Sequence, residues 1–476
     1  MEQAIWVSPE EMQAQREAAR CVREMPDRPR SYFIVTYGCQ MNAHDSEILA
    51  GMMEQMGMTP ASSREEAELI LFNTCCIRDN AERKALGNMA YLRALKRSNP
   101  RLILCVCGCM IQQPRMAQVI LRQYPFFDIA FGTHNLHRFS EFLLQALNTR
   151  RQVLCVETSQ GRIAEGLPCR PESGISAYVS IMYGCNNFCS YCIVPYVRGR
   201  ERSRAQDDIL REVEGLLERG VMQITLLGQN VNSYGNDRSD GASFPALLRR
   251  LDALGVPRIR FMTSHPKDLS DELIAAMAES KHCARHFHLP VQSGSDAILK
   301  AMNRVYDRET YLRRVEALRK AMPEIALTTD VIVGFPGESE EDFADTLSLL
   351  KLVRYDSAFM FAYSPREGTR AAQMPQRVPE EIASDRLTRL IALQEGISAQ
   401  ALAGLVGSRQ RVLVEEVSKR NARQLAGKCT RNITCNFDAD PALIGSFARV
   451  LVREAGHNSL KADFVCTEEK EAPEWP

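Results

Sequence analysis

The stretch Cys185-Asn186-Asn187-Phe188-Cys189-Ser190-Tyr191-Cys192 places three thiols in one short loop. Their spacing is Cys-x3-Cys-x2-Cys, and no fourth Cys or His follows closely. Structural zinc usually has four ligands in two separated pairs, whereas a four-iron cubane held by three thiolates keeps one iron open to another ligand. The spacing therefore favours a reactive iron–sulfur site. Two alternatives stay open: zinc completed by a distant Cys or His, and reduced cysteines of a protein core.

The loop also carries an aromatic residue, Tyr191, directly before its last cysteine. In this Cys-x3-Cys-x-aromatic-Cys pattern it resembles the radical S-adenosylmethionine enzymes. The resemblance implies that Cys185, Cys189 and Cys192 hold a [4Fe–4S] cluster whose open iron binds S-adenosylmethionine. It also implies reductive cleavage of that molecule to a 5′-deoxyadenosyl radical, which abstracts hydrogen from C–H bonds.

Strand-like apolar runs separated by helical patterns begin immediately before the loop. They cover residues 178–182, 223–227, 258–262, 286–289, 326–333 and 358–362. Six βα units predict a partial (β/α)6 barrel with its active face at the carboxyl ends of the strands. The candidate cofactor-binding residues at that face are Tyr191, Gln229, Ser264, Gln292 and Asp330. His265 and His288 lie near the same face, and two readings stay open for them: structural histidines or ligands.

Before the loop, four apolar runs alternate with helical patterns. The runs cover 32–37, 69–72, 102–106 and 128–131, which predicts an open parallel α/β sheet covered on both faces. Cys39, Cys75 and Cys109 each follow one of the first three runs. Since carboxyl ends of parallel strands share one edge, these thiols are candidates for a second three-cysteine site. Buried core cysteines are the alternative, which we prefer for Cys105 and Cys107.

The segments around these cysteines carry a second resemblance. Tyr37-Gly38-Cys39-Gln40-Met41-Asn42, Asn73-Thr74-Cys75 and Gly108-Cys109 resemble the N-terminal domain of the methylthiotransferases, a branch of the radical S-adenosylmethionine enzymes. The resemblance implies that Cys39, Cys75 and Cys109 hold an auxiliary [4Fe–4S] cluster through which sulfur reaches the product. The neighbouring Cys76 leaves the choice of the second ligand open.

A basic segment follows the loop. Arg198, Arg200, Arg202 and Arg204 fall within seven residues, and guanidinium groups bind phosphates in bidentate fashion, so the segment is a candidate RNA contact. The alternative is a solvated helix entry with Ser203 as its cap. The stretch from Cys192 to Arg204 also resembles its counterpart in methylthiotransferases.

The end of the chain has a different character. After a helical connector at 380–400, alternating runs at 411–416, 424–428, 447–452 and 461–465 predict a small antiparallel β-barrel. Arg409, Arg411, Lys419 and Arg420 give it a basic surface, which favours RNA binding over a merely solvated face. The module resembles the TRAM domain, which binds tRNA.

Length and composition set the organisation. A chain of 476 residues exceeds one hydrophobic core, which predicts several domains. We expect an N-terminal extension (1–30), an N-terminal methylthiotransferase domain (31–148), a turn-rich linker (149–176), a radical S-adenosylmethionine barrel with its connector (177–400) and an RNA-binding barrel with a tail (401–476). We expect a helix or partial disorder in the extension and a short hairpin at 151–156. Cys155 and Cys169 in the linker are interpreted as incidental.

Charge and cysteine usage restrict the partners. Lys+Arg and Asp+Glu both number 59, so a nucleic-acid partner has to be argued from local patches. The 16 cysteines occur without a signal-peptide pattern or a long apolar run. A cytoplasmic location, with metal binding in place of disulfides and no membrane partner, is the expectation.

Within the methylthiotransferases, the segments at 38–42, 76–84 and 228–234 resemble members that methylthiolate the C2 carbon of N6-dimethylallyladenosine next to the anticodon. The resemblance implies two [4Fe–4S] clusters, with S-adenosylmethionine as both methyl donor and radical source. The implied partners are the tRNA anticodon stem-loop, an electron-donor protein and an iron–sulfur assembly or carrier protein. We expect the protein itself to be a monomer. Alternatives are methylthiolation of N6-threonylcarbamoyladenosine in tRNA or of a ribosomal-protein aspartate, and a non-catalytic iron–sulfur RNA-binding sensor.

Overall fold

The computed structural model describes residues 6–76, 79–157 and 161–468, which form two compact units. Unit 1 comprises Met1–Glu172, Ser180–Asn186 and Cys192–Arg204, and unit 2 comprises Ser173–Val179, Asn187–Tyr191 and Ala205–Pro476. The chain passes between the units within the three-cysteine loop. Cys185 and Cys192 therefore belong to unit 1, and Cys189 belongs to unit 2.

A six-stranded sheet in the order β2-β1-β3-β4-β5-β6, with every pair parallel, forms the centre of unit 1. Its strands are β1 (Ser31–Thr36), β2 (Thr59–Pro60), β3 (Leu69–Thr74), β4 (Ile103–Gly108), β5 (Ile129–Phe131) and β6 (Val153–Cys155). Leu69 and Leu71 pack in one apolar cluster, and Ile70 and Phe72 pack in another. This alternation places one cluster on each face, as expected for a doubly covered sheet. The predicted parallel sheet is confirmed.

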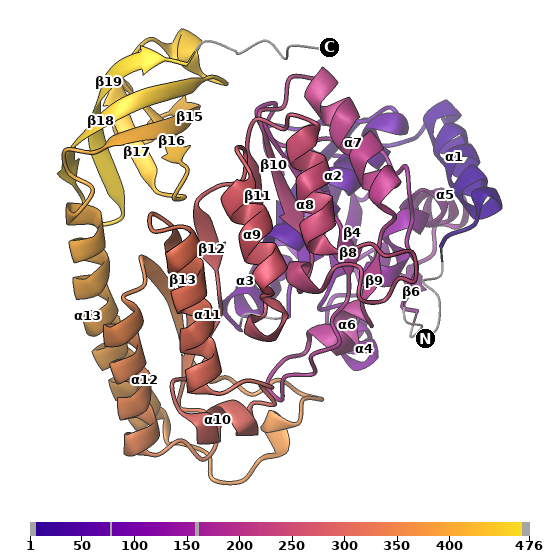
Figure 1. The fold of residues 1–476 in the computed structure, drawn as a ribbon. Helices are drawn as coiled ribbons and strands as arrows, with labels where there is room; N and C mark the ends of the chain where they lie inside the picture. Colours follow the sequence, from indigo (N-terminus) through magenta and orange to yellow (C-terminus); the bar gives the residue numbers. More distant parts are fainter. Residues whose placement is uncertain (1–5, 77–78, 158–160, 469–476) are drawn as a thin grey trace. The chain divides into compact units, whose positions relative to one another are not determined.

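Helices cover both faces of the sheet (Figure 1). Apolar residues of α1 (Pro9–Glu24), α2 (Gln40–Gln55) and α5 (Phe139–Thr149) join the first cluster, and those of α3 (Asp79–Ser98) and α4 (Pro114–Gln123) join the second. The expected N-terminal helix is α1, which begins with a capping box between Ser8 and Glu11. Cys105 and Cys107 lie in the first cluster, which confirms that they are core residues.

One segment of unit 1 differs from the expectation, and another lies partly outside the described residues. The predicted hairpin at 151–156 is wrong: Val153–Cys155 forms β6, which pairs in parallel with β5 as the sixth strand of the sheet. A hairpin would pair with its sequence neighbour, whereas β6 finds its partner across α5. Within the segment 76–84 that carries part of the family resemblance, residues 77 and 78 lie outside the described residues.

Unit 2 contains the six predicted barrel strands. They are β7 (Ser176–Ser180, whose last residue is assigned to unit 1), β10 (Gln223–Leu227), β11 (Ile259–Phe261), β12 (His286–His288), β13 (Ala326–Val333) and β14 (Ser357–Ala362). The order is β7-β10-β11 in one sheet and β12-β13-β14 in the next. Ile259 connects the two sheets, because its amide donates to the His282 carbonyl and its carbonyl accepts from the Ala284 amide, both at 2.9 Å. The predicted partial barrel is confirmed.

Helices separate these strands along the chain, as the sequence predicts. They are α7 (Gln206–Glu218), α8 (Phe244–Ala253), α9 (Asp271–Glu279), α10 (Asp296–Ala301), α11 (Arg308–Ala321) and α12 (Glu340–Val353). Ser243, Ser270, Asp307 and Ser339 cap the first turns of α8, α9, α11 and α12 with their side chains. The long connector α13 (Glu380–Ala403) follows β14.

A closed five-stranded barrel follows α13 (Figure 1, yellow). Its strands are β15 (Arg409–Val417), β16 (Gln424–Cys429), β17 (Thr434–Asp438), β18 (Phe447–Ala455) and β19 (Ser459–Thr467). The sequence reading missed β17, and β17 pairs with β19 in parallel, so the barrel is not antiparallel throughout. A closed ring of five strands cannot alternate in direction throughout, because five is an odd number, so at least one neighbouring pair has to be parallel. None of the described helices could cross a membrane.

Candidate active site: two sets of three cysteines

Cys39, Cys75 and Cys109 lie directly beyond the carboxyl ends of three neighbouring strands, β1, β3 and β4. Cys75 and Cys109 are fully buried, and Cys39 is half-buried at the N-cap of α2. Gly38 has φ +112°, and a Cβ there would lie 2.7 Å from the Cys75 Sγ atom. Only glycine tolerates both conditions, so the backbone entering Cys39 rests against the thiol of Cys75.

The three thiols also interact electrostatically. Burial raises the pKa of the Cys109 thiol to about 12, the Arg198 guanidinium partly offsets this, and Cys75 and Cys39 raise it further. Cys76 packs in the apolar cluster that also holds residues of α3 and α4, and Cys109 belongs to the same cluster. Three soft thiol donors beyond one sheet edge, two of them fully buried, fit a [4Fe–4S] cluster.

A hydrogen-bonded network that the sequence reading missed surrounds this edge. The Asn42 amide donates to the carbonyls of Tyr37 (2.9 Å) and Thr74 (3.0 Å). Arg198 donates to Asn42 Oδ1 at 2.8 Å and to Asp45 Oδ2 at 2.6 Å. Burial alone would lower the pKa of Arg198, but the charges of Asp45 and Cys109 raise it well above its usual value. A permanent cation therefore stands beside the buried thiols.

Of the four arginines predicted to contact RNA after the loop, three are internal. Arg198, Arg202 and Arg204 are each less than a tenth exposed. Arg202 donates to the carbonyls of Arg198 (3.2 Å) and Arg200 (2.8 Å), and Arg204 donates to the Ser180 carbonyl and to both oxygens of Glu165. Because their donors are directed into unit 1, these three side chains hold the segment in place. Arg200 is exposed.

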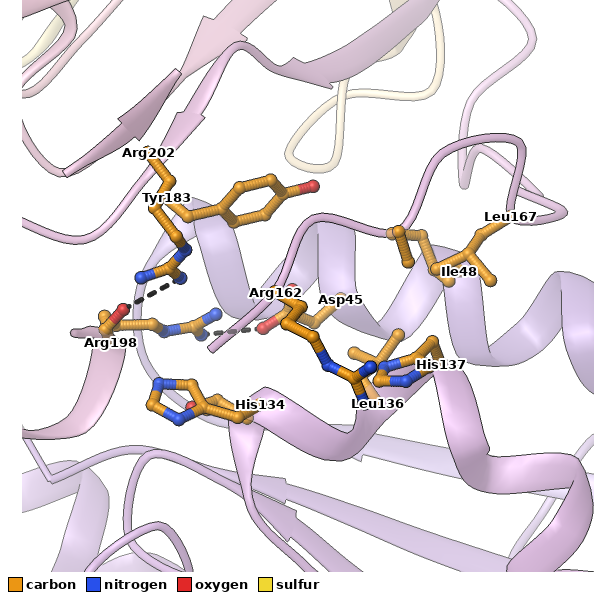
Figure 2. A pocket seen from close by; sticks show the side chains of 12 residues that line it. Asp45, Ile48, His134, Leu136, His137, Arg162, Leu167, Tyr183, Arg198 and Arg202 are labelled. Atoms are coloured by element: carbon orange, nitrogen blue, oxygen red, sulfur yellow. Dashed lines mark hydrogen bonds and ion pairs between the residues drawn. The ribbon is translucent and has the colours of Figure 1, made fainter. Parts of the chain in front are cut away.

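A cavity of about 50 Å³ adjoins the Asp45–Arg198 pair (Figure 2). His134, His137 and Arg162 also line it, and burial together with Arg162 lowers the pKa of His137 to about 4. Pockets for organic ligands measure roughly 300–1,000 Å³, so this one has room only for a few waters or a small ion. The cavity itself therefore does not accommodate a nucleoside.

The amino end of the three-cysteine loop is fixed within unit 1. The Cys185 amide donates to the Gly199 carbonyl at 3.0 Å, and the amides of Asn186 and Glu201 each donate to the other residue's side chain, at 3.2 and 3.3 Å. Strands β8 (Met182–Tyr183) and β9 (Arg202–Ser203), which flank these contacts in the chain, pair with each other. The arginine-rich segment thus forms the support on which Cys185 is mounted.

The middle of the loop is fixed within unit 2. Arg304 donates to Cys189 Sγ at 3.3 Å and to the Pro290 carbonyl at 2.9 Å, and it is buried. The backbone of Ser190 bonds to the Met302 carbonyl (2.9 Å) and the Ala371 amide (2.7 Å). The sequence reading missed Arg304, since an isolated arginine in a turn matches no motif. A buried guanidinium therefore lies within hydrogen-bond distance of this thiol.

The five candidate cofactor-binding residues all lie in unit 2. Ser264 follows β11, and its buried Oγ has no hydrogen-bond partner among the described residues. Gln292 has φ +71° and bridges to Val331, while Asp330 lies 3.4 Å from His288 Nε2. Gln229 is half-buried after β10, and Tyr191 packs against Met302 and Phe335. An unpartnered buried hydroxyl at this edge fits a polar ligand such as S-adenosylmethionine.

The two histidines at this face have structural partners. His265 Nδ1 accepts the Lys267 amide at 3.2 Å, and burial first, then Arg304, lowers its pKa far below the usual range. His288 Nδ1 lies 2.9 Å from the Thr328 hydroxyl, in addition to its contact with Asp330. Their interpretation as structural residues agrees with these contacts.

The basic residues of the C-terminal barrel differ in availability. Arg409, Lys419 and Arg420 are exposed. Arg411 is half-buried, stacks 3.6 Å from the centre of the Phe447 ring and pairs with Glu468 at 2.5 Å. Three of the four predicted RNA contacts on the barrel are therefore accessible to a polyanion, and Arg411 mainly packs.

Family models match three parts of the chain. Residues 31–132 match a family described as uncharacterized protein family UPF0004, residues 179–350 match the radical SAM superfamily, and residues 404–465 match the TRAM domain. The first match contains Cys39, Cys75 and Cys109, the second contains the three-cysteine loop, and the third contains nearly the whole closed barrel.

A solved structure with a similar fold is the radical S-adenosylmethionine methyltransferase TsrM from Kitasatospora setae, with cobalamin and a [4Fe–4S] cluster bound. Its TM-score is 0.53 at 13% identity, covering 72% of this chain and 74% of that one. At this identity the likeness concerns the fold alone.

Curated relatives match over nearly the entire chain. The tRNA-2-methylthio-N(6)-dimethylallyladenosine synthase of Acetivibrio thermocellus is 48% identical over 97% of this chain and 98% of its own. Its counterpart in Caldicellulosiruptor saccharolyticus is 49% identical over 92% and 93%. This chain belongs to the family of the tRNA-2-methylthio-N(6)-dimethylallyladenosine synthases.

Proposed function

We propose that this protein is a tRNA methylthiotransferase that adds a methylthio group to the C2 carbon of N6-dimethylallyladenosine next to the anticodon. One observation carries the proposal. Unit 1 combines three thiols at one sheet edge with the segment that follows Cys192, and Arg198 joins the two by its bonds to Asn42 and Asp45. The segment that supports Cys185 and the candidate site for sulfur transfer are thereby joined within unit 1.

Different residues of the chain bind the two clusters, orient the thiols and bind S-adenosylmethionine. Cys39, Cys75 and Cys109 hold one [4Fe–4S] cluster, and Cys185, Cys189 and Cys192 hold the other. Bound there, the two clusters and S-adenosylmethionine supply the sulfur, the methyl group and the radical that reacts at the adenine C2–H bond. Arg304 orients Cys189, and Asn42 with Arg198 orients the edge at Cys109. Tyr191, Gln229, Ser264, Gln292 and Asp330 line the S-adenosylmethionine site.

The chain binds tRNA, and its TRAM domain supports this role. We assign the anticodon stem-loop as the bound part, with Arg409, Lys419 and Arg420 contacting its phosphates. The protein acts as a cytoplasmic monomer, receives electrons from a donor protein and obtains its clusters from an iron–sulfur carrier protein.

Nucleoside analysis of tRNA tests the substrate. A strain lacking the gene should lose the 2-methylthio group from N6-dimethylallyladenosine and regain it with the wild-type gene but not with Cys189→Ala. An unchanged nucleoside would defeat the assignment, and loss from N6-threonylcarbamoyladenosine instead would support the alternative substrate. Release of 5′-deoxyadenosine by the reduced protein separates an enzyme from an iron–sulfur sensor, which would release none.

A further inference from the structure

Three metal-binding side chains that the activity does not use meet in unit 1. His44 and Glu47 lie one turn apart on α2, and Cys169 approaches them from the segment that follows α5. Their donor atoms all lie within 4.8 Å of one another, and His44 and Glu47 are buried. The set includes none of the six cysteines at the two cluster sites.

The separation of the His44 and Glu47 donor atoms suits zinc. An imidazole nitrogen, a carboxylate oxygen and a thiolate bind Zn²⁺ at about 2.0–2.3 Å, which makes the edge of the tetrahedron about 3.4 Å. His44 Nδ1 and Glu47 Oε2 are 3.3 Å apart. The thiolate and imidazole disfavour Mg²⁺ and Ca²⁺, which prefer oxygen alone.

The surrounding structure already orients the carboxylate. The Glu172 amide donates to Glu47 Oε1 at 3.0 Å, which leaves Oε2 directed at His44. Such an outer partner is the usual means of fixing a metal-binding carboxylate.

The segment that carries Cys169 is held closely on α2. The Arg170 amide donates to the Glu47 carbonyl at 3.0 Å, and Arg170 Nε lies 2.7 Å from Glu54 Oε1. A Cβ at Gly51 would lie 2.7 Å from the backbone of Pro168, so glycine permits this approach. The thiol therefore reaches the helix with its backbone already ordered.

We propose that His44, Glu47 and Cys169 bind one zinc ion, with water at the fourth position, and that the ion fastens the segment at 168–172 to α2. Binding releases the Cys169 proton and involves no redox change. Because α2 starts directly after Cys39, the ion also stiffens the helix that carries Asn42 and Asp45. The inference does not depend on the proposed function.

The test uses full-length protein with its iron sites loaded, so that the cluster cysteines are occupied. After dialysis against Zn²⁺, metal analysis should find about one zinc per chain, and zinc X-ray absorption should show one sulfur with nitrogen and oxygen ligands. Three sulfur ligands would place the zinc at a cluster site and overturn the proposal. No retained zinc would overturn it as well.

Zinc binding by single-residue variants tests whether the ion lies at these three side chains. Cys169→Ser preserves the size of a half-buried side chain and should weaken zinc binding by at least about 100-fold, above the range for outer-shell changes. His44→Gln should do the same. Cys155→Ser, at another half-buried thiol of unit 1, is the matched control and should retain the zinc. Unchanged zinc in Cys169→Ser, with iron content intact, would refute the site.

Discussion

At the scale of single residues, two buried arginines position the candidate active site. Arg198 bonds to Asn42 and Asp45 beside Cys109, and Arg304 bonds to Cys189 and the Pro290 carbonyl. A guanidinium keeps its charge even when buried, and its fork of donors can bind several acceptors at once. Each arginine therefore provides a fixed positive charge and also joins two separate segments of the chain by hydrogen bonds.

Loss of Arg198 should destabilise unit 1 locally. Arg198→Met leaves Asp45 buried without its cation, at a cost of about 3–5 kcal/mol. We expect amide hydrogen exchange in α2 to accelerate by at least about 100-fold, measured by mass spectrometry. Arg200→Met, at an exposed arginine two positions away, should change it little. Equal exchange in both variants would show that the ion pair does not hold α2.

Loss of Arg304 should act on the loop cluster. Arg304→Gln removes a donor from Cys189 Sγ, and hydrogen bonds to cluster sulfurs help to set the reduction potential. We expect a more negative potential by electron paramagnetic resonance titration, and 5′-deoxyadenosine release slowed roughly 10–100-fold. Lys300→Gln, at an exposed cation nearby, is the control. A potential equal to that of the wild type would refute this role.

At the scale of elements, short strands were the hardest to predict. Val153–Cys155 and Thr434–Asp438 have only three and five residues, and each finds a partner distant in sequence. Periodicity needs several residues to become visible, and the parallel partner of Val153–Cys155 leaves no turn signal beside that strand. The longer runs, such as β13 with eight residues and β14 with six, were predicted correctly because their apolar pattern exceeds one period.

The closed barrel should contribute electrostatic affinity for tRNA. Arg409→Gln combined with Arg420→Gln should weaken binding and lower the slope of log affinity against log salt by about 0.7–0.9 for each lost phosphate contact. The matched control is Arg453→Gln with Lys461→Gln, two exposed cations of the same barrel already paired with Asp463 and Glu454. Equal slopes in wild type and both variants would place the tRNA contacts elsewhere.

At the scale of the whole molecule, the two sets of cysteines should act as separate iron sites. After anaerobic reconstitution, the triple alanine variant at Cys185, Cys189 and Cys192 should keep about half of the iron, since two [4Fe–4S] clusters hold eight irons in total. The triple variant at Cys39, Cys75 and Cys109 should keep the other half, and Cys155→Ala should keep it all. Complete loss from either triple variant, with circular dichroism unchanged, would contradict independent sites.

The sequence alone determined the local chemistry of this protein. Three thiols within eight residues, the cysteines after three strand-like runs and the long βα repeats were all legible, because each depends on neighbours along the chain. The resemblance to methylthiotransferases added the reaction and its cofactors.

Only the tertiary structure decided which residues support that chemistry. Arg198, Arg202 and Arg204 looked like a surface for phosphates, yet they are buried. Arg198 and Arg204 have ion-pair partners in distant segments, Asp45 and Glu165. Arg304 and Cys169 belong to no sequence motif. Their roles became visible only from their neighbours in space, Cys189 for Arg304 and His44 for Cys169. Burial and charge pairing depend on which distant segments meet in space, and no spacing along the chain records that.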